Sequence, residues 1–150
     1  MERRVAVHYS QVLAELENVK VEGRISRRKT DELRRAFGAR FTAAWKLVKE
    51  GRVKKYVFKP SGKVQWIVVG RERDYLIYEA SGYCSCDDFY MSIMEGKAKA
   101  CKHLIAQRLA CELGLYEVVE ENDQNQERLM KEWRKAERLQ NLPLSLTGPV

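Results

Sequence analysis

The chain has 150 residues, about the size of one ordinary domain, with 45% hydrophobic and 33% charged residues. This composition is typical of a globular protein, and the length allows a core that does not depend on a metal for all of its stability. The longest apolar runs, such as WIVV at 66–69, are far too short to span a membrane. The net charge of +7 and the isoelectric point of about 9.3 favour a polyanionic partner, either nucleic acid or an acidic protein face.

The N-terminal stretch MERRVAVHYSQVLAEL has two arginines but no apolar core after them, so no secretory signal is expected. We therefore expect an intracellular protein, in the cytoplasm or, in a eukaryote, in the nucleus. Thiols stay reduced in those compartments, and clustered cysteines there indicate metal binding more often than disulfides.

Two helices are expected in the first third of the chain. The first covers residues 10–20 and is capped by Ser10. After a basic loop, the second is expected from Thr30, as its cap, to Gly51, with Gly38 as a point that breaks or kinks it. Its apolar stripe consists of Leu33, Phe37, Phe41, Ala44 and Val48.

The middle of the chain changes to the pattern of strands. The segments RVKKYVFK (52–59), VQWIVVG (64–70) and YLIYEA (75–80) are rich in β-branched and aromatic residues. The turn sequence PSGK (60–63) joins the first two, and a polar loop joins the second to the third. These segments predict a three-stranded antiparallel meander.

Three helices are expected after the strands: a short one capped by Asp87 or Asp88 and ending at Met94, one from Cys101 to Gly114, and one from Asp123 to Gln140. The second buries Leu104, Ile105 and Leu109. The third carries Leu129, Met130, Trp133 and Ala136 on one side, which either dock a partner or pack on the protein's own core; the core is slightly favoured. The uncharged tail 141–150 is expected to be loose.

Four potential ligands for a soft metal lie within 20 residues of one another. They are Cys84 and Cys86 in a C-x-C pair and, after 14 intervening residues, Cys101 and His103 in a C-x-H pair. Structural zinc takes four such thiolate and imidazole ligands, and a site closed by four protein ligands has no open position for catalysis. The pattern therefore predicts a structural Zn²⁺ site, while Cys111 and His8 are left out of it as ordinary core or surface residues.

At these residues the sequence resembles the SWIM-type zinc finger, whose pattern is C-x-C, a variable gap, then C-x-H. The resemblance covers roughly Val53 to Ala110, including YCSCDDF and ACKHLIA. A narrower resemblance is to the free-standing SWIM subunits of Shu-type recombination complexes, which carry C-x-H-x-x-A, here completed by Ala106, and a leader similar to AWKLVKEGRVKKYVFKPSGKVQWIVVG. Many family members have C-x-C-P-x-F, and here Asp87 replaces the proline.

The resemblance implies a zinc finger in ββα order that acts as a nucleic-acid or protein-interaction module. The Shu-type subunits work beside RecA-family recombinase paralogues and support strand exchange in homologous recombination. The whole chain is thus expected to be α+β, with N-terminal helices, a three-stranded antiparallel sheet, the SWIM finger and C-terminal helices. Its parts are expected to be a helical segment (1–51), a zinc-finger region (52–114) and a C-terminal helix with a loose tail (115–150), in one compact unit.

The expected function is that of an accessory factor in homologous recombination or DNA repair. It would bind nucleic acid, with DNA favoured over RNA, and a protein partner such as a RecA-family recombinase paralogue. The alternative is an RNA- or ribosome-associated zinc-binding module. No phosphate-binding loop, dinucleotide fingerprint or nucleophile elbow is present, so no enzyme is expected. Asp87 and Asp88 are explained more simply by helix capping than by a Mg²⁺ site.

Basic residues concentrate in the first half of the chain. From Lys20 to Lys63 there are fifteen Lys and Arg against four acids, a net charge of +11, whereas Glu112 to Glu137 has a net charge of −4. Tyr56, Trp66 and Tyr83 lie among the basic residues and stack on bases if exposed, although strand aromatics are more often core. The predicted phosphate contacts are Arg27, Arg28, Lys29, Arg34, Arg35, Lys54, Lys55, Lys59, Lys63, Lys97, Lys99 and Lys102.

Overall fold

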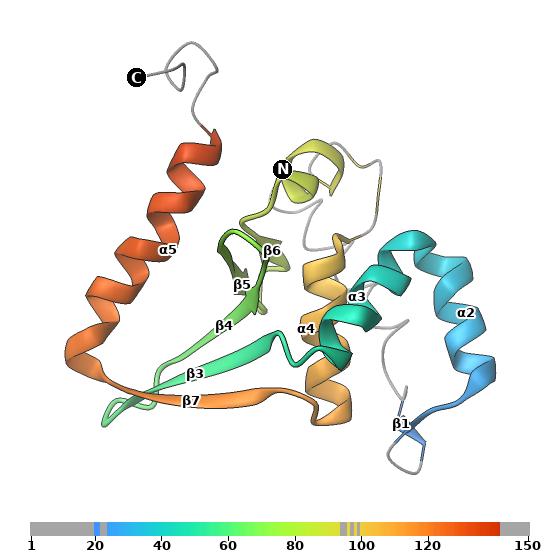
Figure 1. The fold of residues 1–150 in the computed structure, drawn as a ribbon, viewed down its shortest axis with the longest axis horizontal. Helices are drawn as coiled ribbons and strands as arrows, with labels where there is room; N and C mark the ends of the chain where they lie inside the picture. The colour runs from blue at the N-terminus through green and yellow to red at the C-terminus, as the bar shows by residue number, and fades with distance from the viewer. Residues whose placement is uncertain (1–19, 22–23, 94–95, 97, 99, 142–150) are drawn as a thin grey trace.

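The computed structural model describes residues 20–21, 24–93, 96, 98 and 100–141 (Figure 1). The elements follow in the order β1 (Lys20–Val21), β2 (Arg24–Ile25), α2 (Arg27–Phe37), α3 (Ala39–Lys49), β3 (Val53–Lys59), β4 (Val64–Val69), β5 (Asp74–Tyr78), β6 (Tyr83–Cys84), η1 (Phe89–Ile93), α4 (Lys102–Leu113), β7 (Glu117–Asn122), η2 (Asp123–Asn125) and α5 (Gln126–Asn141). The fold is α+β, as expected. The helix expected at 10–20, His8 and the tail 142–150 lie outside the described residues.

The main sheet has five strands in the order β6-β5-β4-β3-β7. The predicted meander is present as β3, β4 and β5, each antiparallel to the next. The prediction of only three strands is wrong, because β6 pairs antiparallel with β5 and β7 pairs parallel with β3. The sheet is therefore mixed, and a separate two-stranded hairpin of β1 and β2 precedes it.

Strand β7 has the sequence EVVEEN, which carries no strong strand signal because three of its six residues are acidic. Its pairing with β3 supplies the stabilisation that its own weak strand propensity does not. Glu117 lies opposite Lys54 and forms an ion pair with it, and Val119 lies opposite Tyr56. The backbone hydrogen bonds of a ready-formed neighbouring strand, together with complementary charge, thus recruit a segment of low strand propensity.

The two faces of the sheet are covered by different helices (Figure 1). Val68 and Ile77 belong to the larger core, which they share with α2, α3 and α4. Ile67 and Leu76, their neighbours in sequence, face the other way and form a smaller core with Trp133 of α5. Adjacent residues in a strand point to opposite faces, so the apolar run WIVV reflects burial on both sides.

The helix expected from Thr30 to Gly51 is two helices. Gly38 separates α2 from α3 with φ of 64° and ψ of −138°, a conformation that side chains with a Cβ rarely adopt, so the expected break is confirmed. The expected cap is wrong: the hydroxyl of Ser26 accepts the Lys29 N–H at 3.1 Å, and the helix already begins at Arg27. Ser26 has the extended backbone that a cap requires, whereas Thr30 lies within the first turns.

The helices after the sheet lie close to their expected places. Helix α4 begins after Cys101 and ends at Gly114, and it buries Leu104, Ile105 and Leu109 as predicted. Helix α5 places Trp133 in the smaller core, with Leu129 and Met130 packed against it. These three side chains therefore pack on the protein's own sheet and do not form a free docking surface. None of the helices in the described ranges is long and apolar enough to cross a membrane.

Candidate metal centre

The structure brings Cys84, Cys86, Cys101 and His103 together. Cys84 ends the short strand β6, Cys86 follows two residues later, and Cys101 and His103 lie at the start of α4. Their ligand atoms all lie within 4.8 Å of one another, and all four side chains are buried. Pairing of β6 with the edge of the meander places the C-x-C pair, and packing of α4 on the sheet places the C-x-H pair.

Two of the thiols also organise the backbone beside them. Cys101 Sγ accepts the N–H of Leu104 at 3.5 Å and caps α4, and Cys86 Sγ accepts the N–H of Phe89 at 3.3 Å. The sulfur of Cys86 thus accepts the N–H at the start of η1, and capping of this short helix by Asp87 or Asp88 stays a prediction. Backbone N–H groups that point at sulfur favour the thiolate form, which is the form that binds metal.

The three thiols do not share one acid–base character. Hydrogen bonds with Cys101 and Cys84 hold the pKa of Cys86 far below its usual range. Burial raises the pKa of Cys84 and of Cys101 well above the usual range. A cation at the centre would favour the thiolate form of the buried thiols and offset the cost of their burial.

The imidazole of His103 is held in place by packing, and one of its nitrogens lacks a hydrogen-bond partner. Its ring stacks on Tyr75, with centroids 4.1 Å apart and planes inclined by 28°. Within the described residues, the buried Nδ1 of His103 has no hydrogen-bond partner. A buried polar atom without a partner requires an explanation, and a bound ion is one. Three thiols and one imidazole make up the four ligands of a structural zinc ion.

An ion pair connects helix α3 to the cysteine loop, the segment 85–88 that carries Cys86. The guanidinium of Arg40 donates two hydrogen bonds of 2.8 Å to the carboxylate of Asp88. This pairing lowers the pKa of Asp88 and raises that of Arg40, to which the nearby Cys101 and Cys86 also contribute. Arg40 thus adds positive charge beside the thiols. Sequence analysis did not single it out, because 48 residues separate the two partners.

Comparison with known proteins agrees with this arrangement. A zinc finger SWIM domain-containing protein 7 homolog from Dictyostelium discoideum is 32% identical to the chain over 83 residues. The expected resemblance to SWIM zinc finger proteins is confirmed. The match covers 54% of this chain and 53% of the relative, so the chain spans about half the length of the relative that it matches. No family model matches the chain.

The basic residues predicted to contact nucleic acid fall in three parts of the fold. Helix α2 carries Arg27, Arg28, Lys29, Arg34 and Arg35; β3 and its hairpin carry Lys54, Lys55, Lys59 and Lys63; and Lys102 begins α4. Lys97 and Lys99 lie outside the described residues. Several of the others already interact within the protein: Arg28 and Lys29 pair with Glu32, Lys54 pairs with Glu117, and Lys55 lies over the ring of Trp66.

The three aromatic residues considered for base stacking pack within the protein. Trp66 is buried and meets Tyr116 edge-on at 5.0 Å. Tyr56 packs edge-on against Trp133 at 5.1 Å, and Tyr83 against Phe89 at 5.0 Å. The core interpretation is correct for Trp66, and the other two rings are half-buried.

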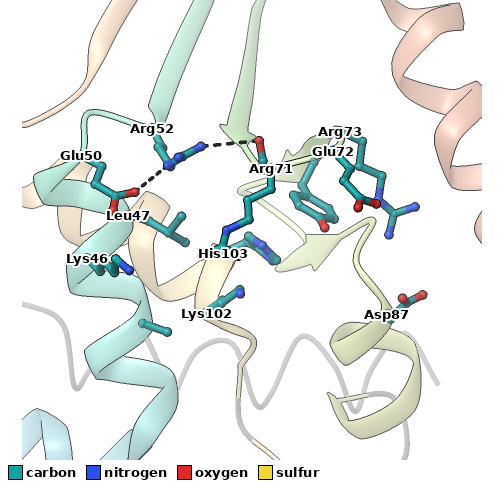
Figure 2. Close-up of a pocket in the computed structure, with 13 residues that line it drawn as sticks. Lys46, Leu47, Glu50, Arg52, Arg71, Glu72, Arg73, Asp87, Lys102 and His103 are labelled. Atoms are coloured by element: carbon teal, nitrogen blue, oxygen red, sulfur yellow. Dashed lines mark hydrogen bonds and ion pairs between the residues drawn. The ribbon is translucent and has the colours of Figure 1, made fainter.

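Lys102 belongs to a basic cavity that sequence analysis did not find. The cavity has a volume of about 830 Å³ and lies between α3, the loop at 70–73 and the start of α4, with His103 in its wall (Figure 2). Its other cations are Lys46, Arg52, Arg71 and Arg73. They come from three separate segments of the chain, so the sequence does not show that they share a cavity. The basic stretch from Lys20 to Lys63 indicates only two of them, Lys46 and Arg52.

Proposed function

We propose that this chain is a zinc-binding SWIM protein that serves as a non-catalytic accessory factor in homologous recombination or DNA repair. The observation that carries the proposal is the buried Cys84–Cys86–Cys101–His103 cluster at the junction of β6 and α4. The 32% identity to a SWIM domain-containing protein supports it. When bound, zinc would supply a fixed tetrahedral link between the sheet and α4, with all four positions taken by the protein.

The proposed zinc ion has a structural task. Without it, three thiols would face one another in a buried space, where burial opposes the ionisation of Cys84 and Cys101. With it, the cysteine loop and α4 would be locked in one relative position. The exposed surfaces beside this junction would then be held in a constant shape toward a partner, which is what a binding module requires.

Nucleic acid, with DNA favoured, is the partner that the charge supports best. The chain carries a net charge of +7, and the exposed residues Arg27, Arg34 and Arg35 share helix α2. A RecA-family recombinase paralogue is the proposed protein partner, on the basis of the resemblance to Shu-type subunits. The alternative, an RNA- or ribosome-associated module, uses the same charge and the same metal centre.

Affinity purification of the tagged full chain from its native cell, at moderate salt, tests the proposal. Recovered proteins are identified by mass spectrometry and recovered nucleic acids by sequencing, with a Cys84→Ser chain as the matched control. A RecA-family ATPase that is enriched with the wild-type chain and lost with Cys84→Ser is the expected result. Ribosomal proteins and ribosomal RNA in its place would overturn the recombination role and support the alternative.

A further inference from the structure

The cavity beside His103 is lined mainly by charge. Five cations, from Lys46, Arg52, Arg71, Arg73 and Lys102, face it together with three acids, from Glu50, Glu72 and Asp87. Ala43 and Leu47 are its only aliphatic lining residues among those described. Clefts for small organic ligands or for peptide side chains are lined mainly by apolar groups. This cavity instead has the lining of a site for an anion that is bound by charge.

Three of the cations are available to a ligand. Lys46, Arg71 and Lys102 are exposed, and within the described part of the chain they form no ion pair. Figure 2 shows them around the same opening, with Glu50 and Arg52 at one end and Glu72 and Arg73 at the other. Three positively charged side chains that converge from α3, the 70–73 loop and α4 form a localised binding site. Cations spread along one helix would form only a solvated basic face.

One acid of the cavity, Glu50, is already paired with a cation. Glu50 is held by Arg52 through a hydrogen bond of 2.6 Å, and the N–H groups of Arg52 also reach the carbonyl oxygens of Val69 and Gly70. The pKa of Glu50 is lowered, first by that hydrogen bond and further by the charges of Arg52, Lys46 and Arg71. Lys46 and Arg71 therefore lie near enough to Glu50 to favour its ionised form.

The aromatic wall of the cavity is not arranged to receive a base. The ring of Tyr75 stacks on His103, and the guanidinium of Arg73 lies 4.9 Å from the centroid of the same ring. A ring with two side chains packed on it serves as a rigid wall. This ring is therefore not free to stack on a base, so base identity is not read at this point.

We propose that the cavity binds the phosphodiester backbone of single-stranded nucleic acid, with Lys46, Arg71 and Lys102 as the contacting cations. This inference rests on the nucleic-acid part of the proposed function and assigns that binding to the cavity. A volume of about 830 Å³ is that of a small-ligand cleft, which can admit a short stretch of flexible strand but is too small to enclose a duplex. DNA and RNA share the backbone chemistry, and the test includes both.

The test compares two variants of equal charge. Lys46→Gln/Arg71→Gln removes two cations from the cavity, and Lys131→Gln/Arg134→Gln removes two exposed cations from α5, which carries none of the predicted phosphate contacts. Binding of labelled oligothymidylate and oligouridylate, each about 12 nucleotides long, is measured by fluorescence anisotropy over a range of salt concentrations. Zinc content and melting temperature are measured for every variant, and only variants that match the wild type in both are compared.

The cavity variant is expected to bind about tenfold more weakly, and the slope of log Kd against log salt is expected to fall by about 1.4, since each single-strand phosphate contact contributes about 0.7. The α5 variant is expected to change both quantities little. A third variant, Glu72→Gln, removes a negative charge from the cavity and is expected to tighten binding, which damage to the fold would not do.

The outcomes separate this inference from the proposed function. If the wild type binds both strands and the cavity variant binds equally well, the cavity assignment is wrong and nucleic-acid binding stands. If the wild type binds neither strand, the nucleic-acid part of the proposed function fails as well. If neither strand binds but an acidic peptide does, with the same dependence on Lys46 and Arg71, the cavity is a protein-docking site and the phosphodiester assignment is overturned.

Discussion

The guanidinium of Arg40 holds the carboxylate of Asp88 through two hydrogen bonds of 2.8 Å, which join helix α3 to the loop that carries Cys86. Both side chains remain about one-third exposed, at 38% for Arg40 and 34% for Asp88. A two-point contact of this kind restricts the loop more than a single ion pair does. It therefore bears on how well the thiols are held together as well as on stability.

Asp88→Ala is expected to lower the free energy of unfolding by about 0.5–1 kcal/mol, because water screens a partly exposed pair. It is also expected to speed the release of zinc to a chelator, because the loop loses its anchor. Chemical denaturation and chelator competition measure the two effects. Arg40→Ala and the double variant complete the cycle, and additive effects in the double variant would contradict direct coupling between the two side chains.

Cys101→Ser is expected to reduce bound zinc from one ion per chain to almost none when a chelator competes. Serine still accepts the Leu104 N–H as a helix cap, so this change removes the metal ligand while it preserves the start of α4. A large drop in melting temperature should accompany the loss of zinc. Cys111→Ser is the control and should leave both unchanged. Retention of zinc by Cys101→Ser would refute the proposed ligand set.

Gly70→Ala is expected to disturb the metal centre from a distance. A Cβ at this position would lie 2.6 Å from the carbonyl oxygen of Arg73 and 2.6 Å from the Tyr75 ring, so the ring that stacks on His103 must move. We expect a loss of about 1–3 kcal/mol and faster zinc release. Gly62→Ala, where the strain comes from a φ of 78° in the hairpin, should lower stability without a change in zinc release.

Trp133→Ala is expected to detach α5 from the sheet and to cost about 3–5 kcal/mol, the usual range for removal of a buried tryptophan side chain. Trp133 packs on Phe58, Ile67 and Leu76 and is only 6% exposed. Urea denaturation measures the change. Arg134→Ala, at the neighbouring exposed position, should change stability little. Equal losses in the two variants would mean that the whole helix, rather than this contact, is sensitive to substitution.

Asp74→Asn is expected to stabilise the protein at neutral pH. Burial raises the pKa of Asp74, although the Trp133 side chain hydrogen-bonds it and partly offsets this effect. A carboxyl group with a raised folded pKa destabilises the fold once it ionises, and this penalty disappears below the unfolded pKa of about 3.9. The variant should therefore melt about 1–2 °C higher at about pH 7, with no difference near about pH 3.

Thermal melts across this pH range give the comparison, with Glu120→Gln as an exposed control that loses the same charge. A lower melting temperature for Asp74→Asn at neutral pH would show that the hydrogen bond between Trp133 and the ionised carboxylate stabilises the fold by more than burial of the charge destabilises it. In that case the sign of the pH dependence would also reverse, with the wild type gaining stability over the variant as the pH rises.

The sequence by itself determined the parts of this protein whose interactions are local. The C-x-C and C-x-H pairs, the three strands β3, β4 and β5 and the limits of α4 follow from spacing, periodicity and turn residues that lie close together in the chain. A close cluster of thiol and imidazole side chains is typical of a zinc site, so the spacing of these residues in the sequence indicates metal binding directly. The break at Gly38 is local for the same reason, since a positive φ is a property of one residue.

Only the tertiary structure decided the features that depend on distant segments. Strand β7 forms because β3 offers it an edge, the loop that carries Cys86 is tied to α3 because Arg40 pairs with Asp88, and the basic cavity exists because α3, the 70–73 loop and α4 converge. Each of these contacts joins residues that are far apart in the chain. Their energy comes from packing and charge in three dimensions, which local propensity and periodicity do not encode.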